Sequence, residues 1–240
     1  MLIYGINPVL EAIRAGRVRE LRIADRTSGG VGEAIAAAER TGIPVRRVQS
    51  TDLARMSRGG VHQGVVADVE DSREYSVNDL VIGASGSPLI VVLDGIEDPH
   101  NVGAILRSVD AAGADGVVRQ SRRAAPLDGA AAKAAAGAVS HVKIAEVVNI
   151  ARAVEELKAA GVWTVGLAGD SPKRYDQLDL TVPTAFVLGA EGTGLRRLVR
   201  ERCDWLVSIP MRGHVDSLNV SVAAGIALFE AVRQRTAAGR

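Results

Sequence analysis

Short apolar runs alternate with amphipathic stretches over the last two thirds of the chain. The apolar runs lie at residues 89–93, 116–118, 162–167, 185–188 and 205–209. Their length and their aliphatic, β-branched composition are typical of strands buried on both faces. The stretches between and after them, residues 101–112, 149–160 and 217–235, carry apolar side chains at helical spacing. Strands that alternate with helices predict an α/β fold with a mostly parallel sheet and a ligand site near the carboxyl ends of the strands.

The first seventy residues repeat this alternation on a smaller scale. Strands are predicted at residues 21–24, 44–48 and 64–69, and helices at residues 31–40 and 50–56. Another helix is predicted to start at Asn7 and Pro8, with Asn7 as its N-cap and Pro8 at its first position. The pattern indicates a small α/β module ahead of the larger one.

Charge divides the chain at the same place. Residues 1–60 hold 10 basic and 6 acidic side chains (+4), residues 61–87 hold 1 and 5 (−4), and residues 88–240 hold 18 and 17 (+1). The acidic stretch ends in a Gly/Ser/Pro-rich segment, which is typical of a loop or linker. We therefore predict a domain at residues 1–71, a linker at residues 72–87 and a second domain at residues 88–240.

The 240-residue composition excludes several classes of protein. A single cysteine, Cys203, allows no disulfide within the chain and no multi-cysteine zinc site, and the four histidines lack metal-ligand spacing, so no metal is expected. The apolar runs are shorter than the roughly 20 residues of a membrane span, and the first residues do not resemble a signal peptide. A cytoplasmic protein with no membrane partner is expected. Aromatic residues make up 3%, which argues against a base-stacking platform.

Polar or glycine-rich loops follow strands of the second module at residues 94–107, 189–194 and 210–221. At one sheet edge they would enclose a single pocket. The glycine loop has the wrong spacing for a dinucleotide fingerprint, and Glu191 inside it would repel a pyrophosphate; the chain also lacks the GxxxxGK[ST] phosphate loop. The glycine loop suits a ligand without phosphate, held by backbone groups.

Single residues of these loops carry weaker signals. Asn101 and Ser217 could each be a helix N-cap, and Ser217 lacks the context of an acyl-transfer nucleophile. Arg107 stands among apolar neighbours of a predicted helix, which favours a site or ion-pair role. Four arginines near the start could bind phosphate, although a solvated charged face fits them equally well: Arg14, Arg17, Arg19 and Arg22.

Taken together, residues 93–108, 186–195 and 209–223 resemble the three sequence motifs of the SpoU family of RNA ribose 2′-O-methyltransferases, in the SPOUT superfamily. Residues 4–12 and 62–67 resemble the family's N-terminal substrate-binding module. The resemblance implies a C-terminal α/β domain with a deep trefoil knot, a small N-terminal RNA-binding domain similar to ribosomal-protein folds, and a homodimer.

The resemblance also implies the reaction: methyl transfer from S-adenosylmethionine (AdoMet) to the ribose 2′-hydroxyl of a guanosine in 23S rRNA. The residues implied for AdoMet binding are Gly189, Ile209, Met211 and Leu218. The residues implied for catalysis are Asn101, Arg107, Glu191, Ser217 and Asn219. Two alternatives stay open: a tRNA 2′-O-methyltransferase of the same family, and a non-catalytic RNA-binding factor in ribosome assembly.

Overall fold

The computed structural model describes residues 2–25, 30–69, 75–122, 124–127 and 129–239. Contacts divide the chain into two units with separate hydrophobic cores. Unit 1 comprises Met1–Arg73 and Leu127–His141, and unit 2 comprises Glu74–Pro126 and Val142–Arg240. None of the helices in the described ranges is long and apolar enough to cross a bilayer.

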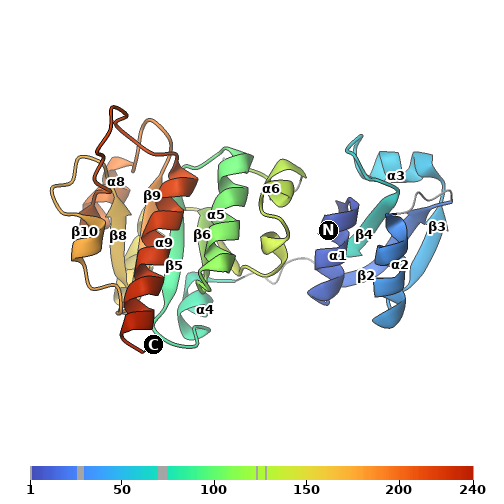
Figure 1. Cartoon of the computed structure of the whole chain (residues 1–240), viewed down its shortest axis with the longest axis horizontal. Coiled ribbons are helices and arrows are strands. Elements are labelled where there is room, and N and C mark those ends of the chain that lie inside the picture. Colours follow the sequence, from blue (N-terminus) through green and yellow to red (C-terminus); the bar gives the residue numbers. More distant parts are fainter. Residues whose placement is uncertain (1, 26–29, 70–74, 123, 128, 240) are drawn as a thin grey trace. The chain divides into compact units, whose positions relative to one another are not determined.

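Unit 1 is built on a mixed four-stranded sheet with the strand order β1-β4-β2-β3; Figure 1 labels β2, β3 and β4 of this sheet. Its strands are β1 (Leu2–Tyr4), β2 (Val18–Ala24), β3 (Val45–Val48) and β4 (Val65–Val69). Its first helices are α1 (Ile6–Arg14), α2 (Val31–Arg40) and α3 (Ser50–Met56). The apolar faces of α1 and α2 form the main core with β2 and β4, whereas Leu53 of α3 packs with Ala24 and Val66 in a separate small cluster.

A second segment of unit 1 comes from the middle of the chain. It contains α6 (Gly129–Ala134) and a 3₁₀ helix, η1 (Ala138–Ser140). Gly137 has a φ of 98°, and a Cβ there would stand 2.5 Å from Cγ of Glu11 on α1. Only a glycine therefore fits this approach without displacing Glu11.

Unit 2 is built on a six-stranded sheet in the order β10-β8-β9-β5-β6-β7, in which every pairing is parallel. The strands are β5 (Leu89–Asp94), β6 (Gly116–Gln120), β7 (Ile144–Val147), β8 (Trp163–Leu167), β9 (Thr184–Gly189) and β10 (Trp205–Val207). All six residues of the central β5 are buried, which explains why its sequence is an unbroken apolar run. The predicted parallel α/β fold is confirmed.

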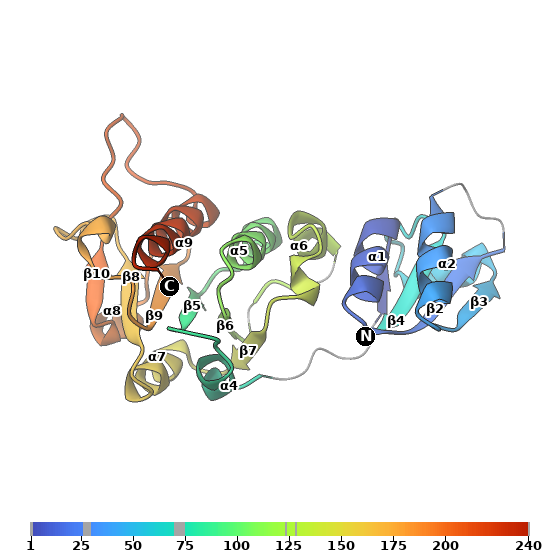
Figure 2. The same ribbon diagram turned by 60° about the horizontal axis from the view of Figure 1, so that its bottom comes forward.

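Helices cover both faces of this sheet. Figure 2 shows α5 (Pro99–Ala111) and α9 (Val220–Ala237) on one face, and α4 (Val77–Ile82) and α7 (Ile150–Ala159) on the other. The core under α4 and α7 also takes Val199 of α8 (Arg197–Arg202). A further 3₁₀ helix, η2 (Tyr175–Gln177), precedes β9.

Local structure departs from the sequence prediction at several points. The stretch expected to be a linker contains α4, which starts with a capping box between Ser76 and Asp79 and buries Val77 and Leu80. Helix α1 begins at Ile6 after Gly5, so the prediction of Asn7 as its N-cap was wrong. Strands β1 and β7, of three and four residues, and the six-residue helix α8 were not predicted, because elements this short show no period.

The carboxyl ends of the parallel strands meet at one edge of the sheet. Asp94 at the end of β5 pairs with Gly189 at the end of β9, and Leu167 of β8 pairs with Val207 of β10. The loops after these four strands therefore start side by side, which is where an α/β sheet binds its ligands.

Candidate functional site

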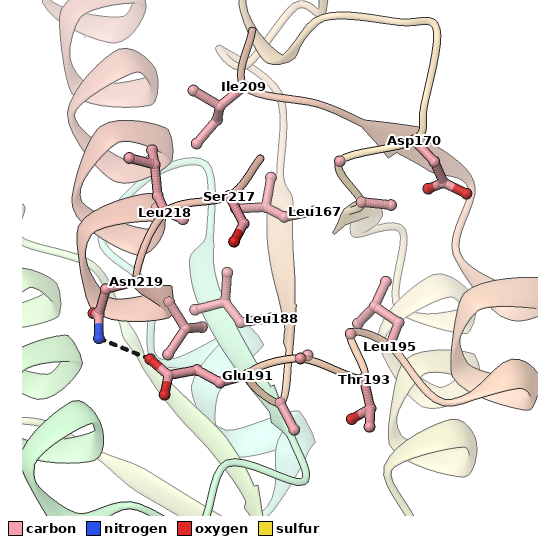
Figure 3. Close-up of a pocket in the computed structure, with 18 of the residues that line it drawn as sticks. Leu167, Asp170, Leu188, Glu191, Thr193, Leu195, Ile209, Ser217, Leu218 and Asn219 are labelled. Carbon is pink, nitrogen blue, oxygen red and sulfur yellow. Dashed lines mark hydrogen bonds between the residues drawn. The ribbon is translucent and has the colours of Figure 1, made fainter. Parts of the chain in front are cut away.

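A cavity of about 530 Å³ opens at this edge; we call it the apolar cavity (Figure 3). Many of its walls are aliphatic side chains: Leu167, Leu188, Leu195, Val207, Ile209, Met211, Leu218 and Val220. The glycine loop, the segment just before α9, Asp170 and Arg200 supply polar atoms. The volume falls within the roughly 300–1,000 Å³ of small-molecule sites. All four residues implied for AdoMet binding line this cavity.

The glycine loop turns back on itself at the mouth of the apolar cavity. The backbone N–H of Gly194 donates to the carbonyl of Ala190 over 2.8 Å, and Gly192 and Gly194 have positive φ angles of 77° and 67°. A Cβ on Gly189 would stand 2.1 Å from the carbonyl carbon of Gly194 and 2.3 Å from the nitrogen of Leu195. Both contacts are backbone atoms, so only glycine allows the loop to close here.

Three of the residues implied for catalysis meet through one amide group. Nδ2 of Asn219 donates to Oδ1 of Asn101 over 2.9 Å and to Oε1 of Glu191 over 2.7 Å; Figure 3 shows the bond to Glu191. Asn219 comes from the start of α9, Asn101 from α5 and Glu191 from the glycine loop. The three sequence motifs therefore converge on a single hydrogen-bonded cluster.

Helix caps hold this cluster in place. Asn219 is the N-cap of α9, because its Oδ1 accepts from the backbone N–H of Ser221 over 2.9 Å. Asp98 caps α5 by accepting from the N–H groups of His100 and Asn101. The expectation that Asn101 and Ser217 are caps was therefore wrong: Asn101 lies inside the first turn, and Ser217 precedes the cap and lines the apolar cavity.

A second cavity, of about 620 Å³, lies on the other side of the glycine loop; we call it the charged cavity. Its charged wall residues are Asp94, Glu97, Asp98, Arg122, Glu191 and Arg196. Ala190, Glu191, Thr193 and Gly194 line both cavities. Asn219 lines the apolar cavity and Asn101 the charged one, so the bond between them spans the junction.

An ion pair ties the charged cavity to the sheet. The carboxylate of Asp94 is fully buried, and it accepts from the backbone N–H of Arg196 over 2.8 Å and from its Nε over 2.6 Å. Nη2 of Arg196 also donates to Oε1 of Gln120 at the end of β6. A buried carboxylate needs this degree of pairing. The pair fixes the start of α8 relative to β5.

The loop after β8 supplies a fourth wall that the sequence reading missed. Ala168, Gly169 and Asp170 follow β8 directly and line the apolar cavity. Asp170 pairs with both terminal nitrogens of Arg200, over 3.0 and 2.9 Å, and these bonds hold the pKa of Asp170 below its ordinary value. The sequence does contain a sign of this wall, because Ala-Gly-Asp directly follows a predicted strand. The loop is short, however, and matches no motif.

Two of the residues implied for catalysis are not part of this hydrogen-bonded cluster: Ser217, which lines the apolar cavity, and Arg107. The side chain of Arg107 is exposed on α5 and lines neither cavity. Among the described residues Arg107 makes no hydrogen bond or ion pair, so of the two roles expected for it the ion pair is not observed, and the site role stays a prediction. Its neighbour Ser108 lies against Gly225 of α9, where a Cβ would stand 3.8 Å from the serine hydroxyl.

The histidines of the loops do not join the cluster either. His100 and His214 are both exposed. Among the residues that the structure describes, no group of three or more His, Cys, Asp or Glu side chains is arranged to hold a metal ion. Cys203 is half-buried, and burial raises the pKa of its thiol to about 12. A thiol of that kind is a poor nucleophile.

The arginines at the start of unit 1 differ in their surroundings. Arg14 bonds to Glu11, and Arg22 bonds to Glu20, through Nε over 2.8 Å. These two are partly neutralised by neighbours on the same unit. Arg17 is partly buried and Arg19 exposed. Charge alone does not mark one phosphate-binding face here.

Comparison with known proteins bears on both units. Residues 88–229 match the model of the SpoU rRNA Methylase family, and residues 2–75 match the model described as RNA 2′-O ribose methyltransferase substrate binding. A 23S rRNA (guanosine-2′-O-)-methyltransferase, RlmB, of Pseudomonas syringae pv. tomato is 44% identical over 98% of this chain and 96% of its own length.

Solved structures agree with these matches. The SpoU methyltransferase AviRb from Streptomyces viridochromogenes, in complex with the cofactor AdoMet, superposes with a TM-score of 0.81 at 29% identity, over 98% of this chain and 90% of that one. An AdoMet-bound rRNA methyltransferase from Sinorhizobium meliloti gives 0.78 at 28% identity, over 97% and 86%.

Proposed function

The chain belongs to the SpoU rRNA methylase family, and on that premise we propose that it transfers a methyl group from AdoMet to the ribose 2′-hydroxyl of a guanosine in 23S rRNA. The observation that supports this function best is the pair of hydrogen bonds from the Asn219 amide to Asn101 and Glu191, which joins the three sequence motifs at the junction of two cavities. One cavity would hold the methyl donor and the other the acceptor nucleotide. A substrate in the ribosome would place the protein in the cytoplasm.

AdoMet fits the apolar cavity by its chemistry. AdoMet carries no phosphate, so Glu191 at the mouth of the cavity does not repel it. Its sulfonium is positively charged, which is compatible with a carboxylate nearby. Aliphatic side chains such as Ile209, Met211 and Leu218 would contact the adenosine, and the backbone from Gly189 onward would supply hydrogen bonds. When bound, AdoMet supplies an electrophilic methyl group. The protein must then orient the acceptor hydroxyl and help to remove its proton.

The cluster at the junction is arranged for orientation. Because both protons of the Asn219 amide are engaged, the Asn101 and Glu191 oxygens cannot rotate freely. Glu191 keeps a second carboxylate oxygen that could accept a bond from the ribose, and Ser217 offers a hydroxyl on the same wall. Because these residues are already held in place, less entropy is lost when the reaction reaches its transition state.

We assign Arg107 to an active site shared between two subunits. Arg107 is exposed on α5. Helix α9 packs against α5, and two apolar residues of α9, Val222 and Phe229, are each 49% exposed. A second copy on this face would bury those side chains and bring Arg107 toward the partner's cavities. A guanidinium is a poor base at neutral pH, so its role would be to bind phosphate and to stabilise negative charge developing on the 2′-oxygen.

The remaining parts of the proposal concern the fold and the RNA. The strand order puts β10 beyond β8 at the sheet edge, after which the chain returns to α9; this path is compatible with the proposed trefoil knot. Unit 1, over residues matched to a substrate-binding model, would select the RNA. Its fold would be of the kind found in ribosomal proteins that bind RNA.

Methyl transfer from radiolabelled AdoMet tests the function. The full-length protein should label 23S rRNA from a strain that lacks the enzyme, at one ribose that resists alkaline cleavage, and should leave already methylated rRNA unlabelled. Labelling of tRNA instead would identify the other branch of the family. RNA binding without transfer to any RNA would indicate an assembly factor and would refute the enzymatic proposal.

A further inference from the structure

We propose that Glu97 reads the base of the acceptor nucleotide, and that the charged cavity is built to select guanine. This inference rests on the proposed function and adds to it a residue that determines specificity. It starts from geometry: the charged cavity adjoins the Asn101–Asn219–Glu191 cluster, where the ribose would lie. A base is bonded to its ribose, so it must occupy the space next to that cluster.

The carboxylates around the charged cavity differ in what they already bind. Asp94 is engaged by Arg196, Asp98 by the two N–H groups at the start of α5, and Glu191 by Asn219. Glu97, one residue before the cap, makes no hydrogen bond or ion pair with any described residue. Of these wall residues, Glu97 therefore keeps a fully available pair of acceptor oxygens.

The chemistry of an unengaged carboxylate selects among the bases. A carboxylate is purely an acceptor, with two oxygens that can take two parallel N–H bonds. Guanine presents two adjacent donors on its Watson–Crick edge, N1–H and the N2 amino group. Adenine, cytosine and uracil each place an acceptor beside their donor on that edge, and this acceptor would face a carboxylate oxygen. Since exposed bases are read on this edge, Glu97 favours guanine.

A positively charged residue in the charged cavity, Arg122, indicates that the cavity suits a nucleotide rather than a free base. Arg122 also lines the charged cavity, is exposed and has no partner among the described residues. It is carried by the segment after β6, which Arg119 anchors by donating from Nη2 to the carbonyl of Ala125 over 2.8 Å. A guanidinium in this place suits a phosphodiester oxygen. Glu97 would thus read the base and Arg122 would hold the backbone.

The test compares RNAs that differ at a single base. Short RNAs carrying the mapped target site are prepared with guanosine, inosine or adenosine at that position; inosine keeps N1–H and lacks the N2 amino group. For the wild-type protein kcat/KM should fall about 10-fold or more from guanosine to inosine, and further to adenosine, because a hydrogen bond to a charged group is lost. For Glu97→Gln the guanosine-to-inosine ratio should shrink toward 1.

Matched variants separate reading of the base from general damage. Glu97→Asp keeps a carboxylate and should still prefer guanosine, whereas Glu156→Gln, which removes a carboxylate of α7 that lines neither cavity, should keep the wild-type ratio. Arg122→Ala should raise KM for all three RNAs alike. The dissociation constant of AdoMet should stay unchanged in all four variants, since none of these residues lines the apolar cavity.

The two proposals fail in different ways. If Glu97→Gln discriminates guanosine from inosine as strongly as the wild type does, the assignment of Glu97 is overturned while the methyltransferase function stands. If the wild-type protein methylates no RNA at all, the proposed function is refuted and the assignment of Glu97 with it.

Discussion

The apolar cavity and the charged cavity share a wall, yet different parts of the chain shape them. The apolar cavity depends on backbone: glycines that permit close approach, and aliphatic side chains from the ends of β8, β9 and β10. The charged cavity depends on side chains: the Asp94–Arg196 ion pair lines it together with Glu97 and Arg122, which have no partner among the described residues. A donor molecule without phosphate needs a fitted shape, whereas a nucleotide needs charge and hydrogen bonds. Under the proposed function, this difference would separate binding of the cofactor in one cavity from selection of the RNA in the other.

The strongest test of this contrast is Gly189→Ala. The new Cβ would meet the backbone of Gly194 at 2.1 Å, and the loop cannot yield without opening the wall between the cavities. We expect AdoMet binding to be lost and kcat/KM to fall about 10³-fold or more, because even small misplacements of reacting groups are costly. Isothermal titration calorimetry and methyl-transfer kinetics measure the two effects.

Gly213→Ala is the matched control for that change. Gly213 lies in the exposed loop before α9, has an ordinary φ, and has nothing within 4 Å of the position of a Cβ. It should bind AdoMet as the wild type does. If Gly189→Ala also bound AdoMet normally while keeping its circular dichroism spectrum, the backbone of the glycine loop would not shape the cavity.

Arg107→Lys should separate binding from catalysis. Lysine keeps the charge but loses the planar fork that binds phosphate or a developing alkoxide in two places. We expect kcat to fall about 100-fold, as when one stabilising donor is removed from an active site, while AdoMet affinity is largely kept because Arg107 does not line the apolar cavity. Equal activity of the two proteins would refute a role for Arg107 in the reaction.

Mixing experiments sharpen the same prediction. If Arg107 acts in the partner's site, then Arg107→Ala and Asn219→Ala, each inactive alone, should regain part of the activity when mixed and allowed to exchange subunits. A dimer with one copy of each holds one intact site. A monomer by light scattering, or no recovery on exchange, would place Arg107 outside a shared site.

The sequence predicted the parallel sheet and the convergence of its loops because both follow from local patterns. An unbroken apolar run such as β5 is readable as a buried strand, and polar residues directly after strands must meet at one edge. The glycine pattern from Gly189 was also readable, although the reason for its first glycine, contact with Gly194, depends on the folded loop.

Other features depend on contacts that no local pattern contains. Asn219 and Ser217 lie two residues apart and are both good caps, so choosing between them needed the actual start of α9. The sequence favoured a site or ion-pair role for Arg107 over a solvated face. It could not show that the side chain is exposed on this chain, because apolar neighbours in a helix indicate the buried side of the helix and not the direction of each polar residue. The charged cavity was not foreseen at all, since its walls come from four separate segments.

The smallest effect is expected at the ion pair of the apolar cavity, Asp170 with Arg200. Both side chains are solvated, 68% and 38% exposed, so water and salt screen the pair. Asp170→Asn should therefore lower Tm at pH 7 by less than about 2 °C. Asp176→Asn, which breaks the half-buried pair with Arg174 away from both cavities, is its control.

The pH dependence of that small effect has a definite sign. Arg200 lowers the pKa of Asp170 in the folded protein, so the contribution of the pair is fully present above the unfolded pKa of about 3.9 and is lost as pH falls through the folded pKa. The difference in Tm between wild type and Asp170→Asn, measured by scanning calorimetry, should shrink between pH 6 and pH 3, and 1 M NaCl should shrink it at neutral pH. A large difference that persisted at pH 3 would mean that the side chain of Asp170 stabilises the apolar cavity through something other than charge, and the contrast between a cavity shaped by backbone and one shaped by side chains would no longer hold.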